Sequence, residues 1–206
     1  MYAGNRFGQH PDRAAFIMAS TNETVTYDEH ERRTNRLAHL LRAEGLQRLD
    51  HYAIFMENNN RCLECSGAGE RSGLYYTCIN SYLTAEELAY IVDNSESRLL
   101  ITSIAKLTVV RAALALCPQV RRCLVVGGGD AVRALNDARF VDFAAAASAF
   151  PDTPIADEWL GTPMLYSSGT TGRPKGILRP LPENPRAWST CRRRRSTTRR
   201  HRPTWH

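Results

Sequence analysis

The sequence predicts an α/β fold in which a parallel β-sheet is flanked by helices on both faces. Short apolar runs, each about as long as a strand, recur along the chain. Longer segments separate them, and in these the apolar residues recur at helical spacing. Because neighbouring parallel strands need a long crossover connection, usually a helix, this alternation is typical of a parallel sheet. The chain has 206 residues and 43% hydrophobic content, enough to bury a sizeable core.

The first helix is expected to begin after Thr26. Thr26 and Glu29 have the spacing of a capping box, in which each side chain accepts a hydrogen bond from a backbone N–H group of the other residue. Residues at helical spacing then continue up to Gly45: Thr34, Leu37 and Leu41. The run AIFME at 53–57 predicts a short buried strand, and a helical region is expected from there to about Tyr75.

A second capping pattern, Thr84 with Glu87, predicts a helix that carries Leu88, Ile91 and Val92. The remaining elements are expected in this order: a strand at 99–103, a helix at 107–117, a strand at 123–128, a short helix at about 140–149 and a last apolar run at 163–168.

A segment rich in hydroxyl groups and glycine, YSSGTTGRPKG at 166–176, follows this last run. Hydroxyl and backbone N–H groups donate hydrogen bonds to phosphate, glycines let the backbone approach the ligand, and a lysine neutralises charge. The spacing is not that of the Walker A motif, because Pro174 stands five residues after Gly169. A flexible linker would not need this combination. We therefore predict a polyphosphate-binding loop with these candidate residues: Ser167, Ser168, Gly169, Thr170, Thr171, Gly172, Arg173, Pro174, Lys175 and Gly176.

The segment MLYSSGTTGRPKG resembles the phosphate-binding motif of the adenylate-forming (AMP-binding) superfamily. That superfamily includes acyl-CoA synthetases, luciferases and the adenylation domains of peptide synthetases. The similarity extends over nearly all of 1–182, through VTYDEHERRTNRLAHLLRAEGL and NSYLTAEELAYIVDNSESRLLITS. Within the superfamily, ILRP and LTAEELAYIVDNSESRLLIT are most similar to bacterial fatty-acyl-CoA synthetases.

The resemblance implies a two-step ligase reaction with ATP, Mg²⁺, a fatty acid and coenzyme A. A carboxylate attacks the α-phosphate of Mg·ATP, which gives an acyl-adenylate and pyrophosphate, and a thiol then displaces AMP. In such enzymes the loop holds the β- and γ-phosphates by electrostatic positioning. By resemblance, the phosphate contacts come from four side chains: Ser168, Thr170, Thr171 and Lys175.

Family members continue for several hundred residues past this loop. Their later sequence carries an adenine- and magnesium-site segment, a ribose-binding aspartate and a C-terminal catalytic lysine, and none of these is found in the 206 residues. We therefore expect 1–182 to be an incomplete, N-terminal part of the large adenylate-forming domain. We expect no ligase activity from this chain by itself.

Residues 183–206 differ sharply in composition from the preceding sequence. They hold eight arginines and one glutamate, and from Pro182 onward there is no Ile, Leu, Val, Met or Phe. The chain has 27 basic and 21 acidic residues in total, so 19 basic and 20 acidic residues remain in 1–182, a net charge of −1. We predict a disordered tail. It is either the product of a shifted reading frame or a basic arm for nucleic acid or another polyanion.

The remaining composition indicates a cytoplasmic protein. The N-terminus has no secretory signal, and no apolar run approaches the length of a membrane span. The six cysteines are expected to be reduced. Cys62 and Cys65 form a C-x-x-C motif, but the second cysteine pair of a zinc site is missing, so they are interpreted as idle thiols or as a redox pair. The glycines at 67, 69 and 73 lack the dinucleotide-binding spacing and are interpreted as close packing of a helix on the sheet.

Three hypotheses of function remain open from sequence. The chain is a non-functional remnant of a fatty-acid–CoA ligase, or it is half of a split ligase that needs a complementing chain. Alternatively, the arginine-rich tail makes the chain a protein that binds nucleic acid or another polyanion, with no specific nucleic-acid sequence expected as partner.

Overall fold

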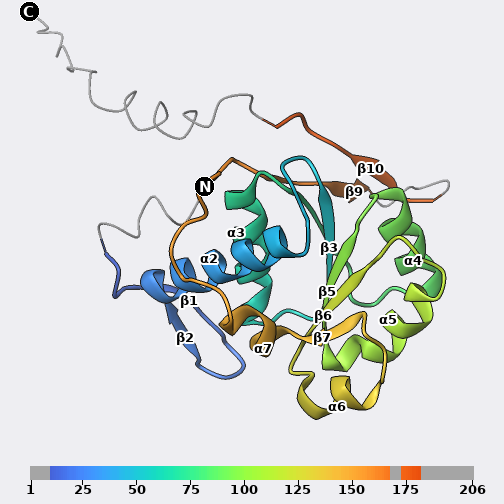
Figure 1. Ribbon diagram of the computed structural model, residues 1–206, viewed down its shortest axis with the longest axis horizontal. Coiled ribbons are helices and arrows are strands. Elements are labelled where there is room, and N and C mark those ends of the chain that lie inside the picture. The colour runs from blue at the N-terminus through green and yellow to red at the C-terminus, as the bar shows by residue number, and fades with distance from the viewer. Residues whose placement is uncertain (1–9, 168–172, 182–206) are drawn as a thin grey trace, which may run out of the picture.

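The computed structural model describes residues 10–167 and 173–181 and shows a three-layer fold, with a sheet between two layers of helices (Figure 1). The sheet is parallel, and its strand order is β7-β6-β5-β3-β4-β8. In chain order the strands are β3 (His51–Phe55), β4 (Tyr75–Ile79), β5 (Leu99–Ser103), β6 (Arg122–Val126), β7 (Phe140–Asp142) and β8 (Thr162–Pro163). The predicted α/β class is confirmed.

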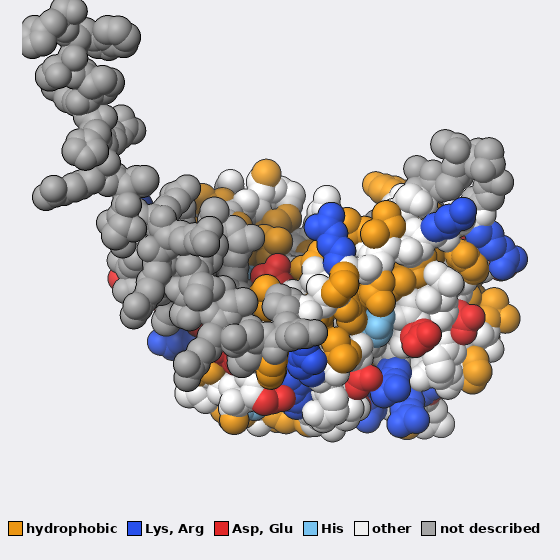
Figure 2. Space-filling view, turned by 90° about the horizontal axis from the view of Figure 1, so that it is seen from above, with side chains coloured by type: hydrophobic (Ala, Val, Ile, Leu, Met, Phe, Trp, Pro, Cys, Tyr) orange, Lys and Arg blue, Asp and Glu red, His pale blue; other side chains and the backbone are white. Residues whose placement is uncertain are grey.

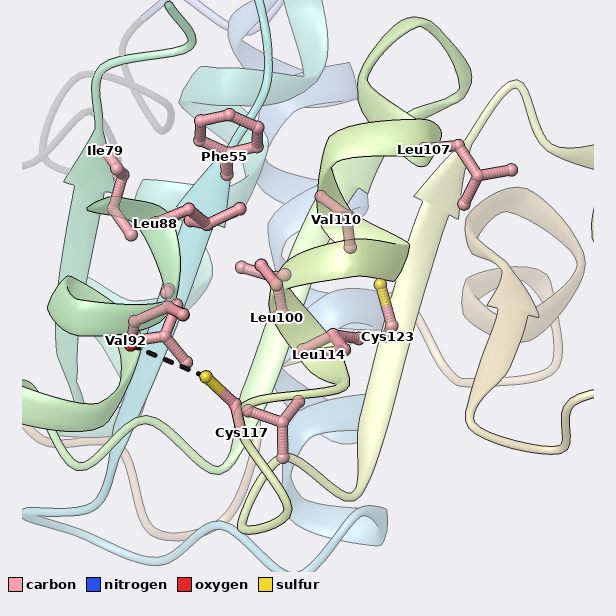
Figure 3. Close-up of a cluster of buried hydrophobic side chains, with 14 of the residues drawn as sticks. Phe55, Ile79, Leu88, Val92, Leu100, Leu107, Val110, Leu114, Cys117 and Cys123 are labelled. Carbon is pink, nitrogen blue, oxygen red and sulfur yellow. Dashed lines mark hydrogen bonds between the residues drawn. The ribbon is translucent and has the colours of Figure 1, made fainter. Parts of the chain in front are cut away.

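Each face of the sheet is covered by its own set of helices. One face packs on α2 (Tyr27–Ala43), α3 (Asn60–Ser72) and α7 (Phe143–Ser148). The other packs on α4 (Ala85–Asn94), α5 (Leu107–Leu114) and α6 (Gly129–Ala134). Figure 3 shows the side chains of α4 and α5 in this buried cluster. Successive residues of β3 alternate between the two cores, as a pleated strand requires.

Two small antiparallel hairpins lie outside this sheet. Strands β1 (Ala14–Ile17) and β2 (Thr24–Thr26) pair just before α2. Strands β9 (Leu165–Ser167) and β10 (Lys175–Ile177) pair at the end of the described chain. A 3₁₀ turn, η1 (Ile104–Lys106), links β5 to α5.

The local signals for helix starts and for one strand are confirmed. The Thr84 hydroxyl accepts from the Glu87 N–H and the Glu87 carboxylate accepts from the Thr84 N–H, so α4 has a complete capping box. Thr26 also caps α2 through the Glu29 N–H. The predicted strand at 99–103 coincides with β5.

The prediction of a helix that reaches Tyr75 is wrong at its C-terminal end, and strand β4 was not predicted. Helix α3 stops at Ser72 because Gly73 adopts a left-handed conformation, with φ of 65°, and caps it. The chain then enters β4 after a single residue, Leu74. The apolar run that follows the cap belongs to the strand.

Further boundaries differ from the predictions: β3 spans 51–55 instead of 53–57, α5 ends at Leu114 instead of residue 117, and β6 spans 122–126 instead of 123–128. The region expected to be one helix at 140–149 begins with β7, and α7 starts only after Asp142, whose carboxylate accepts from the Ala145 N–H. The run at 163–168 is divided, since Thr162–Pro163 pairs with β4 whereas Leu165–Ser167 pairs with β10.

Of the three glycines predicted to pack closely on the sheet, Gly69 does so, whereas Gly67 lies against Thr34 and His30 of α2 and Gly73 lies against Trp159 and Arg48. A Cβ atom at Gly69 would lie 2.4 Å from Oη of Tyr52 and 2.8 Å from the Tyr76 ring. The Tyr52 hydroxyl donates to the Cys65 carbonyl over 2.5 Å, which joins β3 to α3.

Cys62 and Cys65 are both free thiols. In the described ranges, no helix is both long enough and apolar enough to cross a membrane. The tail at 183–206 lies outside the described residues.

Candidate functional site

The predicted phosphate-binding loop joins the two strands of the β9–β10 hairpin. Ser167 pairs with Lys175, Tyr166 with Gly176, and Leu165 with Ile177. The first and the ninth residue of the segment 167–175 therefore lie opposite each other at the mouth of the loop. Both Ser167 and Lys175 are exposed there.

Half of the candidate residues can be placed. The described ones are Ser167, Arg173, Pro174, Lys175 and Gly176, whereas Ser168, Gly169, Thr170, Thr171 and Gly172 lie outside the described residues.

The hairpin lies beside the carboxyl end of β4. A cleft of about 350 Å³ separates it from the sheet and is lined by Thr77–Asn80, Leu83, Ile91, Leu165–Ser167 and Pro174. Ligands of open parallel sheets bind outside the carboxyl ends of the strands, so the loop is at the expected edge. Figure 2, which looks onto the molecule from above Figure 1, shows hydrophobic side chains interspersed with Lys and Arg on this face.

Both ends of the loop are attached to helix α4. Before the loop, the Tyr166 hydroxyl donates to Oδ1 of Asn94 over 2.8 Å. After it, the Tyr90 hydroxyl donates to the Pro174 carbonyl over 3.0 Å, and the Arg173 guanidinium lies 5.0 Å from the centre of the Tyr90 ring. Burial, and then the neighbouring Tyr90, raises the pKa of Tyr166 to about 12, so Tyr166 is a hydrogen-bond donor at neutral pH.

Gly176 lies against β9. A Cβ atom there would lie 2.4 Å from Cε of Met164 and 3.1 Å from the Tyr166 ring. The Met164 methyl group could move, but the ring would have to shift as well. Gly176 therefore allows β10 to approach the tyrosine that is bonded to α4.

A second polar pair lies where the strand order reverses, between β3 and β5. The Ser103 hydroxyl donates to Oε2 of Glu57 over 2.5 Å, and the buried Thr102 hydroxyl donates to the Phe55 carbonyl over 2.7 Å. Such a reversal is a frequent ligand position in open α/β sheets. This pair was not predicted, although Glu57 and Ser103 each end an apolar run in the sequence.

The sequence also offered little signal for Tyr90, Asn94 and Tyr166. Tyr90 and Asn94 are four residues apart on α4, a spacing that any helix face shows. No group of three His, Cys, Asp or Glu side chains placed to hold a metal ion is found among residues 10–167 and 173–181.

Comparisons with known proteins agree with the resemblance. Residues 5–184 match the family described as AMP-binding enzyme. A 3-oxocholest-4-en-26-oate–CoA ligase of Rhodococcus rhodochrous is 32% identical over 169 residues, which cover 82% of this chain and 30% of the relative. A fatty acid–[acyl-carrier-protein] ligase of Streptomyces coeruleorubidus is 32% identical over 155 residues, which cover 75% of this chain and 28% of the relative.

The fold is shared with solved ligases. The crystal structure of the anthranilate CoA ligase AuaEII in complex with anthranoyl-AMP superposes with a TM-score of 0.74 and 20% identity, covering 85% of this chain and 33% of that one. The chain thus spans about 30% of the length of the curated relatives it matches.

Proposed function

This chain belongs to the AMP-binding enzyme family, and on that premise we propose that its segment 166–176 binds the β- and γ-phosphates of Mg·ATP. The observation that carries the proposal is the pairing of Ser167 with Lys175 at the mouth of the hairpin loop. It puts a hydroxyl donor and a cation on opposite sides of one opening. A polyphosphate needs both, because donors bind its oxygens while the cation offsets its charge.

The residues between them complete the site by resemblance to the family. The side chains of Ser168, Thr170, Thr171 and Lys175 contact phosphate, and Gly169, Gly172 and Gly176 shape the backbone. The chemistry at this loop is electrostatic: it orients the leaving pyrophosphate, and no proton transfer is assigned to it.

Residues 1–182 form the part of the ligase that supplies this loop, and residues 183–206 are a separate arginine-rich tail. The intact enzyme would join a carboxylic acid, of the fatty-acid class, to coenzyme A in the cytoplasm. The two relatives described above are named for a steroid acid and for fatty acids, so a long apolar acid is the class that they support.

The chain alone is proposed to bind ATP weakly and not to catalyse ligation. A well-placed charge-assisted hydrogen bond contributes about 1.5–3 kcal/mol, whereas association costs about 4–15 kcal/mol. A few phosphate contacts therefore leave roughly millimolar affinity.

Isothermal titration with MgATP at low salt tests the loop. Lys175→Gln should abolish most of the heat of binding, because it removes the cation at the mouth. Lys106→Gln is the matched control, since Lys106 lies on η1 with its ammonium 5.4 Å from the Tyr82 ring. Equal binding by both variants would show that the arginine-rich tail, or another surface, holds the nucleotide.

A second candidate, half of a split ligase, is favoured by the apolar surface of the hairpin. Leu165 and Ile177 are cross-strand partners, and they are 49% and 50% exposed. Leu178, beside them, is 51% exposed. A complementing chain would cover this surface and bring the remaining machinery. ATP–pyrophosphate exchange should then appear only on mixing with a polypeptide that matches the later part of a relative.

A further inference from the structure

Helix α4 contacts the loop-bearing hairpin at both of its legs. Asn94 accepts from Tyr166, one residue before Ser167, and Tyr90 donates to Pro174, one residue before Lys175. Tyr90 and Asn94 are separated by one helical turn. The two contacts join residues 72 and 84 positions apart in sequence. They therefore fix where the hairpin lies on the sheet, which local sequence cannot do.

The helix is built to be a firm support. Its first turn is closed by the complete capping box of Thr84 and Glu87. Its inner side is buried against the sheet and α5 through Leu88, Ile91 and Val92, of which Leu88 and Val92 are drawn in Figure 3. A capped helix with a buried face resists local opening. Contacts made to its outer side therefore restrain whatever they hold.

Arg173 lies in a cavity of about 380 Å³ on this outer side. The cavity is lined by Leu83, Glu86, Glu87, Tyr90, Arg173 and Pro174. The guanidinium lies over the Tyr90 ring, and Glu86 and Glu87 line the same cavity. This placement supports a role of Arg173 in attaching the loop to α4, in addition to its place among the candidate residues of the phosphate-binding loop.

The loop needs such an attachment because of its composition. Glycines at 169 and 172 give the backbone many accessible conformations, and ordering them on binding reduces the affinity for a ligand. Holding both legs of the hairpin lowers that cost. We propose that α4 positions the phosphate-binding loop, with Tyr90 and Asn94 as positioning residues. The attachment stands on the contacts above, and its consequence for phosphate rests on the proposed function.

Trypsin provides a direct measurement of the attachment. Trypsin does not cleave before proline, so Arg173–Pro174 and Arg179–Pro180 resist it, and Lys175–Gly176 is the one cleavable bond in 173–181. Tyr90→Phe removes the hydroxyl and keeps the ring under Arg173. Asn94→Leu removes the acceptor of Tyr166. Each should raise the initial rate of cleavage at Lys175 about two- to tenfold, as expected for the loss of one hydrogen bond.

Two variants separate the contacts from a general loss of stability. Asn94→Asp keeps an oxygen that accepts from Tyr166 and should restore the wild-type rate. Tyr82→Phe makes the same chemical change on a side chain that is 90% exposed just before α4, and it should leave the rate unchanged. Equal rates in wild type, Tyr90→Phe and Asn94→Leu would overturn the proposal, as would no rescue by Asn94→Asp.

Tripolyphosphate then tests the consequence for the ligand. It should slow cleavage at Lys175 in a saturable way, with a Lys-Gly peptide in the same tube as a check on trypsin itself. The concentration for half protection should rise at least about threefold in Tyr90→Phe and in Asn94→Leu, whereas Asn94→Asp should keep the wild-type value. If wild type is not protected at all, the proposed function fails, while the cleavage rates without ligand still decide the attachment. Equal half-protection in wild type and Tyr90→Phe would overturn the positioning role.

Discussion

The guanidinium of Arg71, on α3, lies 2.7 Å from the carboxylate of Glu31, on α2. Its side chain is 1% exposed, and a second carboxylate, that of Glu158, lies 3.5 Å from it. Glu158 belongs to the segment that leads from α7 to β8, and the Trp159 N–H of that segment donates to the Arg71 carbonyl. One buried cation therefore joins two helices to the chain that leads to β8 and the loop hairpin.

Glu31→Gln is predicted to destabilise the fold by about 3 kcal/mol, because it leaves the charge of a buried arginine poorly compensated. Urea unfolding followed by far-UV circular dichroism measures the change. Asp28→Asn is the control on the same helix: Asp28 pairs with Arg32, whose side chain is 58% exposed, and such pairs contribute below about 1 kcal/mol. A loss for Glu31→Gln as small as that of Asp28→Asn would contradict a stabilising role of the pair.

His30 is predicted to make stability fall as the pH is lowered. Burial, and then the charges of Arg71 and Arg33, lowers its pKa from 6.5 to about 4, so the unfolded chain binds its proton more readily. The stability it contributes is complete above pH 6.5 and is lost as the pH falls through about 4, by up to about 3 kcal/mol. Burial raises the pKa of Glu158 and Glu64, which acts in the opposite direction.

The comparison of wild type with His30→Gln isolates this effect from the carboxylates. Unfolding free energies should fall more steeply between pH 7 and pH 4 in wild type than in the variant. Parallel curves would show that His30 is protonated equally in both states.

Gly69→Ala is predicted to destabilise the protein by about 1–3 kcal/mol, although alanine has a higher helix propensity than glycine. The added methyl would meet Tyr52 Oη at 2.4 Å and the Tyr76 ring at 2.8 Å, and both rings are buried. Combining it with Tyr52→Phe, which removes the nearest atom, should cost less than the sum of the two single changes. Additive losses in chemical denaturation would mean that the helix moves away from the sheet instead.

Local features of this fold could be predicted from sequence, and long-range ones could not. The capping box of Thr84 and Glu87 and the strand at 99–103 depend on neighbouring residues, so their patterns were sufficient. Strand β4 was missed because its apolar run follows the cap of α3 directly, with Leu74 alone between the cap and the strand. The loop motif named the candidate residues, but Tyr90 and Asn94 are brought to its legs by the crossover of α4. That contact exists only in the folded chain.

Ile177→Thr is predicted to reduce self-association. Ile177 faces Leu165 across the hairpin, and their half-exposed side chains form an apolar surface. Among the described residues, β9 and β10 pair with each other and with no further strand. Exposed apolar strands pair with other chains. Threonine keeps the preference for strands while removing apolar area. Sedimentation velocity over a concentration series should show a smaller associated fraction than in wild type.

Ile17→Thr, which changes an isoleucine that is 59% exposed on β1, is the control and should leave the distribution as it was. An equal decrease in both variants would assign association to general surface hydrophobicity and not to the hairpin, and would remove the support that this surface lends to a complementing chain.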